Sequence, residues 1–164
     1  MYVLVSGLPG SGKSTLATAL GLALGWPVLA KDAIKESLWD SLGPGDREWS
    51  ARLGGAAQEL LVQLAATTPD AVLDTFVHQE WAHRVASLPG RVVEVHCGCA
   101  PEVARARYVG RRRHPCHFDA ELPLDTWDRW VRDDAGPLGL DPVLSLDTST
   151  PVDVGAVVAW VRGQ

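Results

Sequence analysis

Short apolar runs alternate along the chain with segments in which apolar residues recur every three or four positions. The runs are bounded by polar, glycine or proline positions, which is typical of strands buried inside a sheet. Five strands are predicted, over residues 2–6, 27–30, 70–74, 91–97 and 142–148. Because strands and helices alternate, we expect an α/β fold with a five-stranded parallel sheet covered on both faces, in three layers.

The segments between the runs predict amphipathic helices. Leu16, Leu20 and Leu24, for example, lie four positions apart and define one apolar face. Helices are predicted over residues 14–24, 32–42, 46–66, 78–88, 101–113, 125–133 and 151–161. Residues 114–123 show no apolar period and are expected to be irregular. The 164 residues suffice for one core and are too few for two, so a single domain over residues 1–164 is expected.

The segment from Gly7 to Ser14 reads G-L-P-G-S-G-K-S, the G-x-x-x-x-G-K-[ST] pattern of a phosphate-binding loop. A strand precedes it and a helix follows it, so backbone N–H groups and the helix N-terminus can face phosphate oxygens. Lys13 is expected to reach the β and γ phosphates of ATP, and Ser14 to ligate Mg²⁺. The predicted ATP-binding residues here are Gly7, Leu8, Pro9, Gly10, Ser11, Gly12, Lys13, Ser14 and Thr15.

Charge and composition narrow the class of protein. The net charge of −5 argues against a broad basic surface for nucleic acid. No apolar run reaches the length of a membrane span, and the chain enters its first strand without a signal-peptide pattern, so a cytoplasmic location without a membrane partner is expected. The sequence does not indicate the oligomeric state. Cys97, Cys99 and Cys116 form no C-x-x-C pair, which favours free thiols over a zinc site.

Missing motifs narrow the class of P-loop protein. The chain has no N-K-x-D guanine motif and no L-S-G-G-Q run, and it is too short for the motor and remodelling ATPases. A phosphotransferase remains. Such an enzyme needs a base for the acceptor, an acidic residue near the metal and cations over the γ-phosphate.

Asp32 is the candidate base, because it directly follows the second predicted strand on the rim that also carries the phosphate-binding loop. The alternative is that Asp32 caps the following helix, and both roles can coexist. Lys35 lies one turn further and either binds an anionic acceptor or is simply solvated. Asp74 ends an apolar strand, as the acid that positions Mg²⁺ or its water does, although an acid in this place can also serve a turn.

Arginines are concentrated in one stretch, at positions 105, 107, 111, 112 and 113. Guanidinium groups there can neutralise the transferred phosphoryl group, so a lid over about residues 105–123 is predicted. Residues 114–123 are expected to be a mobile end of this lid that becomes ordered when nucleotide binds. The alternative for these arginines is a solvated basic face or a set of anchoring ion pairs.

These motifs, in this order, together with "LDTSTP" after the fifth strand, resemble the small P-loop kinases. That group includes chloramphenicol phosphotransferase, the zeta toxins and the 5′-hydroxyl kinase domain of phage polynucleotide kinase. The resemblance implies a catalytic role for Asp32, lid roles for Arg105 and for Arg111 or Arg112, and an adenine-side loop at Thr148. It also implies that Asp74, with Thr75, is the acid ending the third strand, near the substrate.

The resemblance is incomplete at two positions. Asp32 stands alone, whereas gluconate and shikimate kinases have an Asp-x-Asp pair, and Lys35 replaces an arginine of the polynucleotide kinases. We therefore expect ATP-dependent, Mg²⁺-dependent transfer to a hydroxyl of a small molecule or nucleotide. The acceptor pocket is expected between residues 46–66 and residues 76–81. The alternatives are a polynucleotide 5′-hydroxyl kinase and a non-catalytic ATP-binding protein.

Overall fold

The five predicted strands form one parallel sheet. The computed structural model describes residues 1–76, 79–119, 125–133 and 136–164. The strands are β1 (Tyr2–Ser6), β2 (Val28–Ala30), β3 (Ala71–Asp74), β4 (Val92–Gly98) and β5 (Val143–Asp147). Their order across the sheet is β2-β3-β1-β4-β5, which confirms the predicted fold class. In this register Val5 lies opposite Asp74, so the acid that ends β3 lies beside the end of β1.

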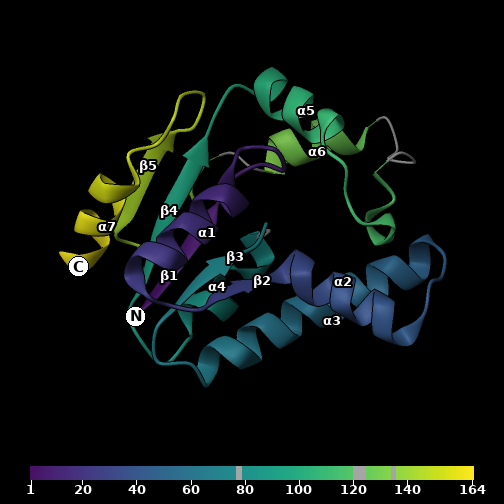
Figure 1. The fold of residues 1–164 in the computed structure, drawn as a ribbon, viewed down its shortest axis with the longest axis horizontal. Coiled ribbons are helices and arrows are strands. Elements are labelled where there is room, and N and C mark those ends of the chain that lie inside the picture. The colour runs from purple at the N-terminus through teal and green to yellow at the C-terminus, as the bar shows by residue number, and fades with distance from the viewer. Residues whose placement is uncertain (77–78, 120–124, 134–135) are drawn as a thin grey trace.

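Helices cover both faces of the sheet (Figure 1). They are α1 (Lys13–Leu24), α2 (Lys31–Leu42), α3 (Arg47–Ala66), α4 (Gln79–Ala86), α5 (Pro101–Gly110), α6 (Thr126–Asp133) and α7 (Val154–Arg162), with a short 3₁₀ helix η1 (Pro115–His117). α1 and α7 lie on one face, and α3 and α4 lie on the other. None of the helices in the described part of the chain is long and apolar enough to cross a bilayer.

The core consists of two apolar layers, one on each face of the sheet. Successive β1 residues point to opposite faces, so Val3 and Val5 pack with Leu20 of α1, whereas Leu4 packs with Leu61 of α3. All five side chains are fully buried. Burial on both faces explains why the central strands read as continuous apolar runs.

Glu94 is a charged residue in the middle of the central strand β4. Its side chain is fully buried, and its carboxylate accepts hydrogen bonds from Ser6 Oγ at 2.6 Å and from three backbone N–H groups of residues 138–140. A buried carboxylate is tolerated when its oxygens are hydrogen-bonded in this way. Glu94 thereby fixes the segment that leads into β5.

Two predicted elements differ from the structure. The helix predicted over residues 101–113 ends at Gly110, because Arg111 adopts an extended backbone with φ −90° and ψ 147°. The closing helix begins at Val154 rather than at residue 151, because the Asp153 side chain caps it by accepting from Ala156 N at 3.1 Å. Part of the predicted irregular segment forms η1. Of the predicted lid end, residues 120–123 lie outside the described residues.

Candidate active site

The loop between β1 and α1 requires glycine at defined positions. Gly7 has φ 128° and Gly10 has φ 91°. A Cβ atom on Gly7 would lie 2.3 Å from the carbonyl oxygen of Cys97, and one on Gly10 would lie 2.2 Å from that of Ala104. These two glycines therefore let the loop pack closely against the end of β4 and against α5.

A polar cavity of about 190 Å³ lies at the N-terminus of α1, and we call it the phosphate cavity. It is lined by Gly10, Gly12, Lys13, Ser14, Thr15, Arg107 and Arg111. Among the described residues, no atom outside Gly12 and its two chain neighbours lies within 4 Å of the place where a Cβ would extend from Gly12, so the loop backbone is open there. Backbone N–H groups, a lysine and two arginines fit a triphosphate.

Lys13 lies between this cavity and two carboxylates. Its Nζ donates to the carbonyl oxygen of Leu8 at 3.3 Å. Burial lowers the pKa of Lys13, while the nearby Asp74 and Asp32 oppose that shift. The ammonium is thus poorly solvated in the free protein, which strengthens its attraction to a phosphate.

An apolar slot of about 340 Å³ adjoins the phosphate cavity. It lies between α1 and the loop after β5, and it shares Gly12, Thr15 and Arg107 with the phosphate cavity. Arg107 donates to the carbonyl oxygen of Thr148 at 3.0 Å and so ties the loop to α5. Thr148 lines the slot, in a position that suits the predicted adenine-side loop.

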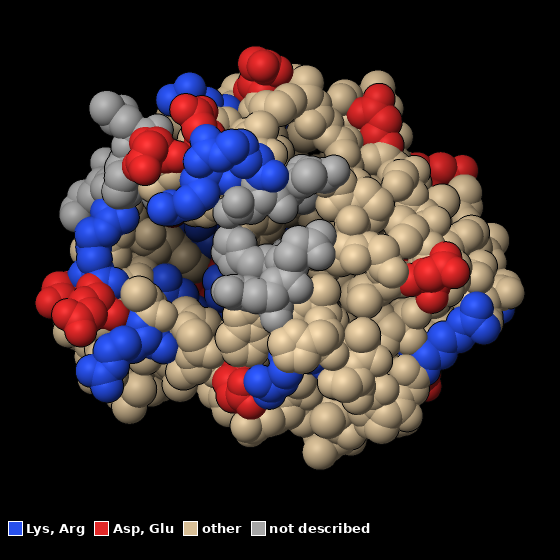
Figure 2. Space-filling view, turned by 180° about the vertical axis from the view of Figure 1, so that it is seen from behind, with Lys and Arg blue, Asp and Glu red and all other residues tan. Residues whose placement is uncertain are grey.

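On its other side the phosphate cavity adjoins a second cavity of about 190 Å³, which we call the basic cavity. Its cationic lining residues are Lys13, Lys31, Lys35, Arg111 and Arg113. Its acidic lining residues are Asp32, Asp74 and Asp119. Figure 2 shows lysine and arginine side chains gathered around a hollow on one side of the molecule. Cations thus dominate a cavity in a protein whose net charge is −5.

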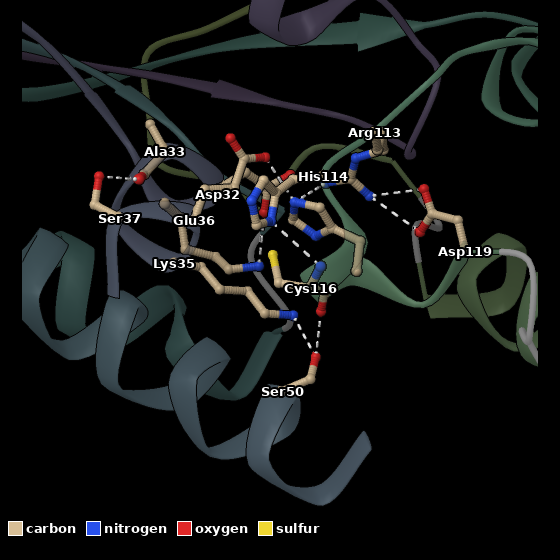
Figure 3. Close-up of polar contacts among 12 residues, drawn as sticks. Asp32, Ala33, Lys35, Glu36, Ser37, Ser50, Arg113, His114, Cys116 and Asp119 are labelled. Carbon is tan, nitrogen blue, oxygen red and sulfur yellow. Dashed lines mark hydrogen bonds and ion pairs between the residues drawn. The ribbon is translucent and has the colours of Figure 1, made fainter. Parts of the chain in front are cut away.

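Asp32 lies in the first turn of α2 and does not cap that helix. The cap residue is Ala30, and no side-chain hydrogen bond caps the helix, so the capping alternative is wrong. Lys31 Nζ lies 3.0 Å from Asp32 Oδ1, and Arg113 forms an ion pair with Oδ2 (Figure 3). Burial opposes ionisation, but the two cations outweigh it and hold the pKa of Asp32 well below its usual value.

Lys35 is buried, so the alternative of a solvated lysine is also wrong. Its side chain donates to Ser50 Oγ at 2.8 Å, and Ser50 Oγ in turn donates to the carbonyl oxygen of Cys116 at 2.5 Å. Among the described residues, no carboxylate forms an ion pair with it. Burial, followed by the nearby Lys31, lowers the pKa of Lys35. A buried ammonium bonded only to a hydroxyl retains donors for an anion.

Asp74 lies at the end of β3, buried beside the phosphate-binding loop. Burial raises the pKa of Asp74, although the nearby Lys13 and Ser14 oppose that shift. A carboxylate and a hydroxyl are the hard oxygen ligands that Mg²⁺ prefers. Ser14 and Asp74 therefore fit the Mg²⁺ site predicted from the sequence.

The predicted lid arginines divide into two groups. Arg111 lines both the phosphate cavity and the basic cavity. Arg105 and Arg112 are exposed and line neither of them. Arg107 and Arg113 occupy the site instead. The run of arginines after the fourth strand was the usable signal in the sequence. Helix spacing does not single out Arg111 and Arg113, because both lie beyond the end of α5 at Gly110.

Sequence reasoning missed a set of side chains that hold Arg113 in place. Arg113 Nη1 lies 3.3 Å from Asp119 Oδ1, which also accepts from the Tyr108 hydroxyl at 2.6 Å. His117 Nε2 lies 3.3 Å from Arg113 Nη2 and 2.8 Å from Glu36 Oε1. Burial, followed by Arg113, lowers the pKa of His117. Three of these contacts join residues 4, 6 and 11 positions apart, but they form in an irregular segment that no helix or strand period describes. The contact of His117 with Glu36 joins residues 81 positions apart.

The two segments expected to form the acceptor pocket contribute to the basic cavity in different ways, and no residue of α3 lines it. From α3, Ser50 supports Lys35, and Gln58 Oε1 accepts from Thr75 Oγ1 at 2.9 Å. Phe76 lines the basic cavity, whereas residues 77–78 of the predicted segment lie outside the described residues.

The cysteines were weighed in the sequence as possible zinc ligands. The described residues contain no cluster of three or more histidine, cysteine or acidic side chains that could hold a metal ion, and Cys97 and Cys116 are buried.

Comparison with known proteins gives the same architecture. A family model described as an AAA domain matches residues 3–134. A crystal structure from Chloroflexus aurantiacus, described as a candidate kinase, is 34% identical, covers 99% of this chain and 96% of its own, and has a TM-score of 0.88. None of the curated proteins matches the sequence.

More distant solved structures share the fold alone. A gluconokinase from Sinorhizobium meliloti is 17% identical over 96% of this chain and 87% of its own, with a TM-score of 0.64. A shikimate kinase from Acinetobacter baumannii, in complex with shikimate, is 12% identical over 98% and 90% of the two chains, with a TM-score of 0.60.

Proposed function

This chain belongs to the P-loop family described as an AAA domain, and we propose that it transfers the γ-phosphate of ATP to a hydroxyl group of a small molecule or nucleotide. The observation that carries the proposal is the series of three adjoining cavities. The apolar slot, the phosphate cavity and the basic cavity follow one another and share lining residues. This order suits an adenine, a triphosphate and an acceptor, with Asp32 in the last cavity.

The proposed chemistry assigns each cation a place. Lys13 and Arg111 line both the phosphate cavity and the basic cavity, so they can neutralise the phosphoryl group as it moves. Bound Mg²⁺, held by Ser14 and by Asp74 through water, would neutralise further phosphate charge. Asp32 would accept the hydroxyl proton of the acceptor as the new P–O bond forms and ADP leaves.

The acceptor is proposed to be small and to carry an anionic group. The basic cavity holds only about 190 Å³, and Lys35 presents a buried ammonium to it without a carboxylate partner among the described residues. An anion beside Lys35 would provide the missing counter-charge. These features favour a small-molecule or nucleotide acceptor over a polynucleotide.

The test is to incubate the protein with γ-labelled ATP, Mg²⁺ and a fractionated cell extract, and to identify the labelled product. We expect a labelled small molecule in one fraction, and no label with Lys13→Ala whose circular dichroism spectrum is unchanged. Label on the 5′-hydroxyl of an added oligonucleotide would instead identify a polynucleotide kinase. A protein that binds ATP but labels nothing in any fraction would contradict the proposal and support a non-catalytic role.

A further inference from the structure

A larger cavity lies beside the basic cavity, and we call it the outer cavity. Its volume is about 630 Å³, against about 190 Å³ for the basic cavity. The two cavities share a wall formed by Tyr108, Arg111, Arg113 and Asp119. The outer cavity therefore adjoins the cavity that contains Asp32, and its volume is large enough for a ring system.

One side of the outer cavity is aromatic. The rings of Trp39 and Phe118 meet edge to face, with centroids 5.9 Å apart and an interplanar angle of 74°. Trp39 is 7% exposed and packs in a buried cluster with Leu53 and Cys116, so its ring is held by the core. Phe118 is half-buried beside it, and Pro115 extends the apolar surface. Such a surface is complementary to a planar ring.

The backbone of Phe118 is strained in a way that glycine would avoid. Phe118 has φ 52° and ψ 32°, and it is the only non-glycine residue with positive φ in the described part of the chain. A bulky side chain is disfavoured in this left-handed region, and strained residues of this kind cluster at ligand clamps. A phenylalanine where glycine would relieve the strain indicates that the ring itself has a role.

The lining of the outer cavity also includes cations, Arg111 and Arg113. The Arg111 guanidinium lies 4.7 Å from the centroid of the Tyr108 ring, and no carboxylate among the described residues forms an ion pair with it. Arg113, by contrast, is held by Asp32 and Asp119. The planar fork of Arg111 therefore retains donors that match a phosphate or carboxylate.

We propose that the outer cavity binds an aromatic ring bearing an anionic group, as the non-reacting part of the phosphate acceptor. The ring would lie against Trp39 and Phe118, and the anionic group would lie at Arg111. That the bound molecule is the phosphate acceptor rests on the proposed function. That the outer cavity binds it rests on the cavity, the aromatic pair and the strained Phe118.

The test measures binding without turnover, by isothermal titration calorimetry. The slot and the phosphate cavity are first saturated with Mg²⁺ and a non-hydrolysable ATP analogue. Three probes are then compared: phenyl phosphate with ring and anion, glycerol 1-phosphate with the anion alone, and benzyl alcohol with the ring alone. Phenyl phosphate is expected to bind at least about tenfold tighter than either of the others, a difference of about 1.4 kcal/mol.

Two Phe118 variants keep the backbone and remove the ring. Phe118→Gly and Phe118→Asn both tolerate positive φ, so both should fold. Each variant is expected to bind phenyl phosphate about fivefold or more weakly than the wild type, with its affinity for glycerol 1-phosphate unchanged. Leu22→Ala, 86% exposed on α1, is the matched control and should change neither.

The outcomes separate this inference from the proposed function. The outer site would be overturned if none of the probes bound or if all three bound equally well. It would also be overturned if both Phe118 variants bound phenyl phosphate as the wild type does. Either result would stand even if the protein phosphorylates an acceptor. Conversely, ring-dependent binding in a protein that never transfers label would support the site and contradict the proposed function.

Discussion

Arg113 forms an ion pair with Asp32 that joins two parts of the chain 81 positions apart. Arg113 lies in the segment after α5, and Asp32 lies in the first turn of α2 (Figure 3). Because Lys31 occupies the other oxygen of Asp32, both oxygens of the candidate base contact a cation in the free protein. Each oxygen retains a further lone pair, and the Asp32 side chain is 46% exposed, so an acceptor hydroxyl can still donate to this carboxylate.

Replacing Asp32 by Asn should separate catalysis from folding. The variant removes the base but keeps the shape of the side chain, so kcat should fall by about 10²–10⁴-fold. ATP affinity should hardly change, because the loop residues bind the nucleotide. Stability should change little, since the Asp32 side chain is 46% exposed and exposed ion pairs contribute weakly.

The measurements are transfer to the identified acceptor, ATP binding by calorimetry and thermal unfolding. Asp153→Asn is the matched control, because it makes the same substitution at an exposed helix cap where Asn also caps. Near-full transfer by Asp32→Asn would exclude Asp32 as the base and make Asp74 the leading candidate.

Replacing Arg113 by Gln should shift the pH dependence of activity. Burial raises the pKa of Asp32, whereas Lys31 and Arg113 lower it, so loss of Arg113 must raise that pKa. A base acts only when deprotonated, and the acid limb of the kcat/KM profile should therefore move to higher pH. Arg112→Gln, on the exposed neighbouring residue, should leave the limb in place. An unmoved limb in Arg113→Gln would show that Asp32 does not control it.

Gly10→Ala and Gly12→Ala should fail in different ways. A Cβ on Gly10 would lie 2.2 Å from the backbone of Ala104, so the loop must shift, and stability should fall by about 1–3 kcal/mol or more. Among the described residues, no atom outside Gly12 and its two chain neighbours lies within 4 Å of a Cβ on Gly12, and Gly12 lines the phosphate cavity. Gly12 has φ 92°, so Gly12→Ala should also cost stability, but less than Gly10→Ala, which adds a backbone clash. The main effect of Gly12→Ala should be weaker ATP binding. Urea unfolding and nucleotide titration of both variants distinguish the two effects, and equal losses of stability would contradict the assignment.

The three thiols should react at different rates. Burial raises the pKa of Cys97 to about 12, and burial also raises that of Cys116. A buried neutral thiol is a poor nucleophile. Brief treatment of the folded protein with iodoacetamide should modify Cys99 first, as peptide mass spectrometry would show, whereas all three should react in denaturant. Preferential labelling of Cys97 would contradict this structure.

The features predicted correctly from the sequence are the ones encoded locally. The five strands, the glycines of the loop and the acid that ends β3 each follow from a run of neighbouring residues, because pleat, turn and helix periods are short. The end of α5 was misplaced for the same reason: Arg111 to Arg113 favour a helix locally, but the segment turns away at Gly110 toward Asp32 and Asp119.

The organisation of the basic cavity depends on pairs that no local pattern records. Arg113 with Asp32, and Ser50 with Cys116, lie 81 and 66 positions apart. The sequence indicated that Lys35 shares a helix face with Asp32, but not whether α3 would bury it. Such contacts are set by how α2, α3 and η1 pack together, and the sequence alone left the choice between a buried and a solvated lysine open.

Replacing Lys35 by Met tests the buried ammonium in two ways. Burial lowers its pKa, so between that lowered value and about 10.5 the unfolded chain binds more protons than the folded chain. The stability contributed through Lys35 therefore rises with pH across this alkaline window, and Lys35→Met should remove that rise. Thermal stability near neutral pH should stay unchanged or increase, since a buried charge is costly.

The same variant tests whether the ammonium binds an anionic acceptor. If it does, KM for that acceptor should rise about tenfold or more, with KM for ATP unchanged, because hydrogen bonds to charged groups are worth about 1.5–3 kcal/mol. Arg112→Met, at an exposed cation that lines neither the phosphate cavity nor the basic cavity, is the control. A variant that unfolds readily but retains the wild-type KM for its acceptor would show that Lys35 serves only to join α2 to α3.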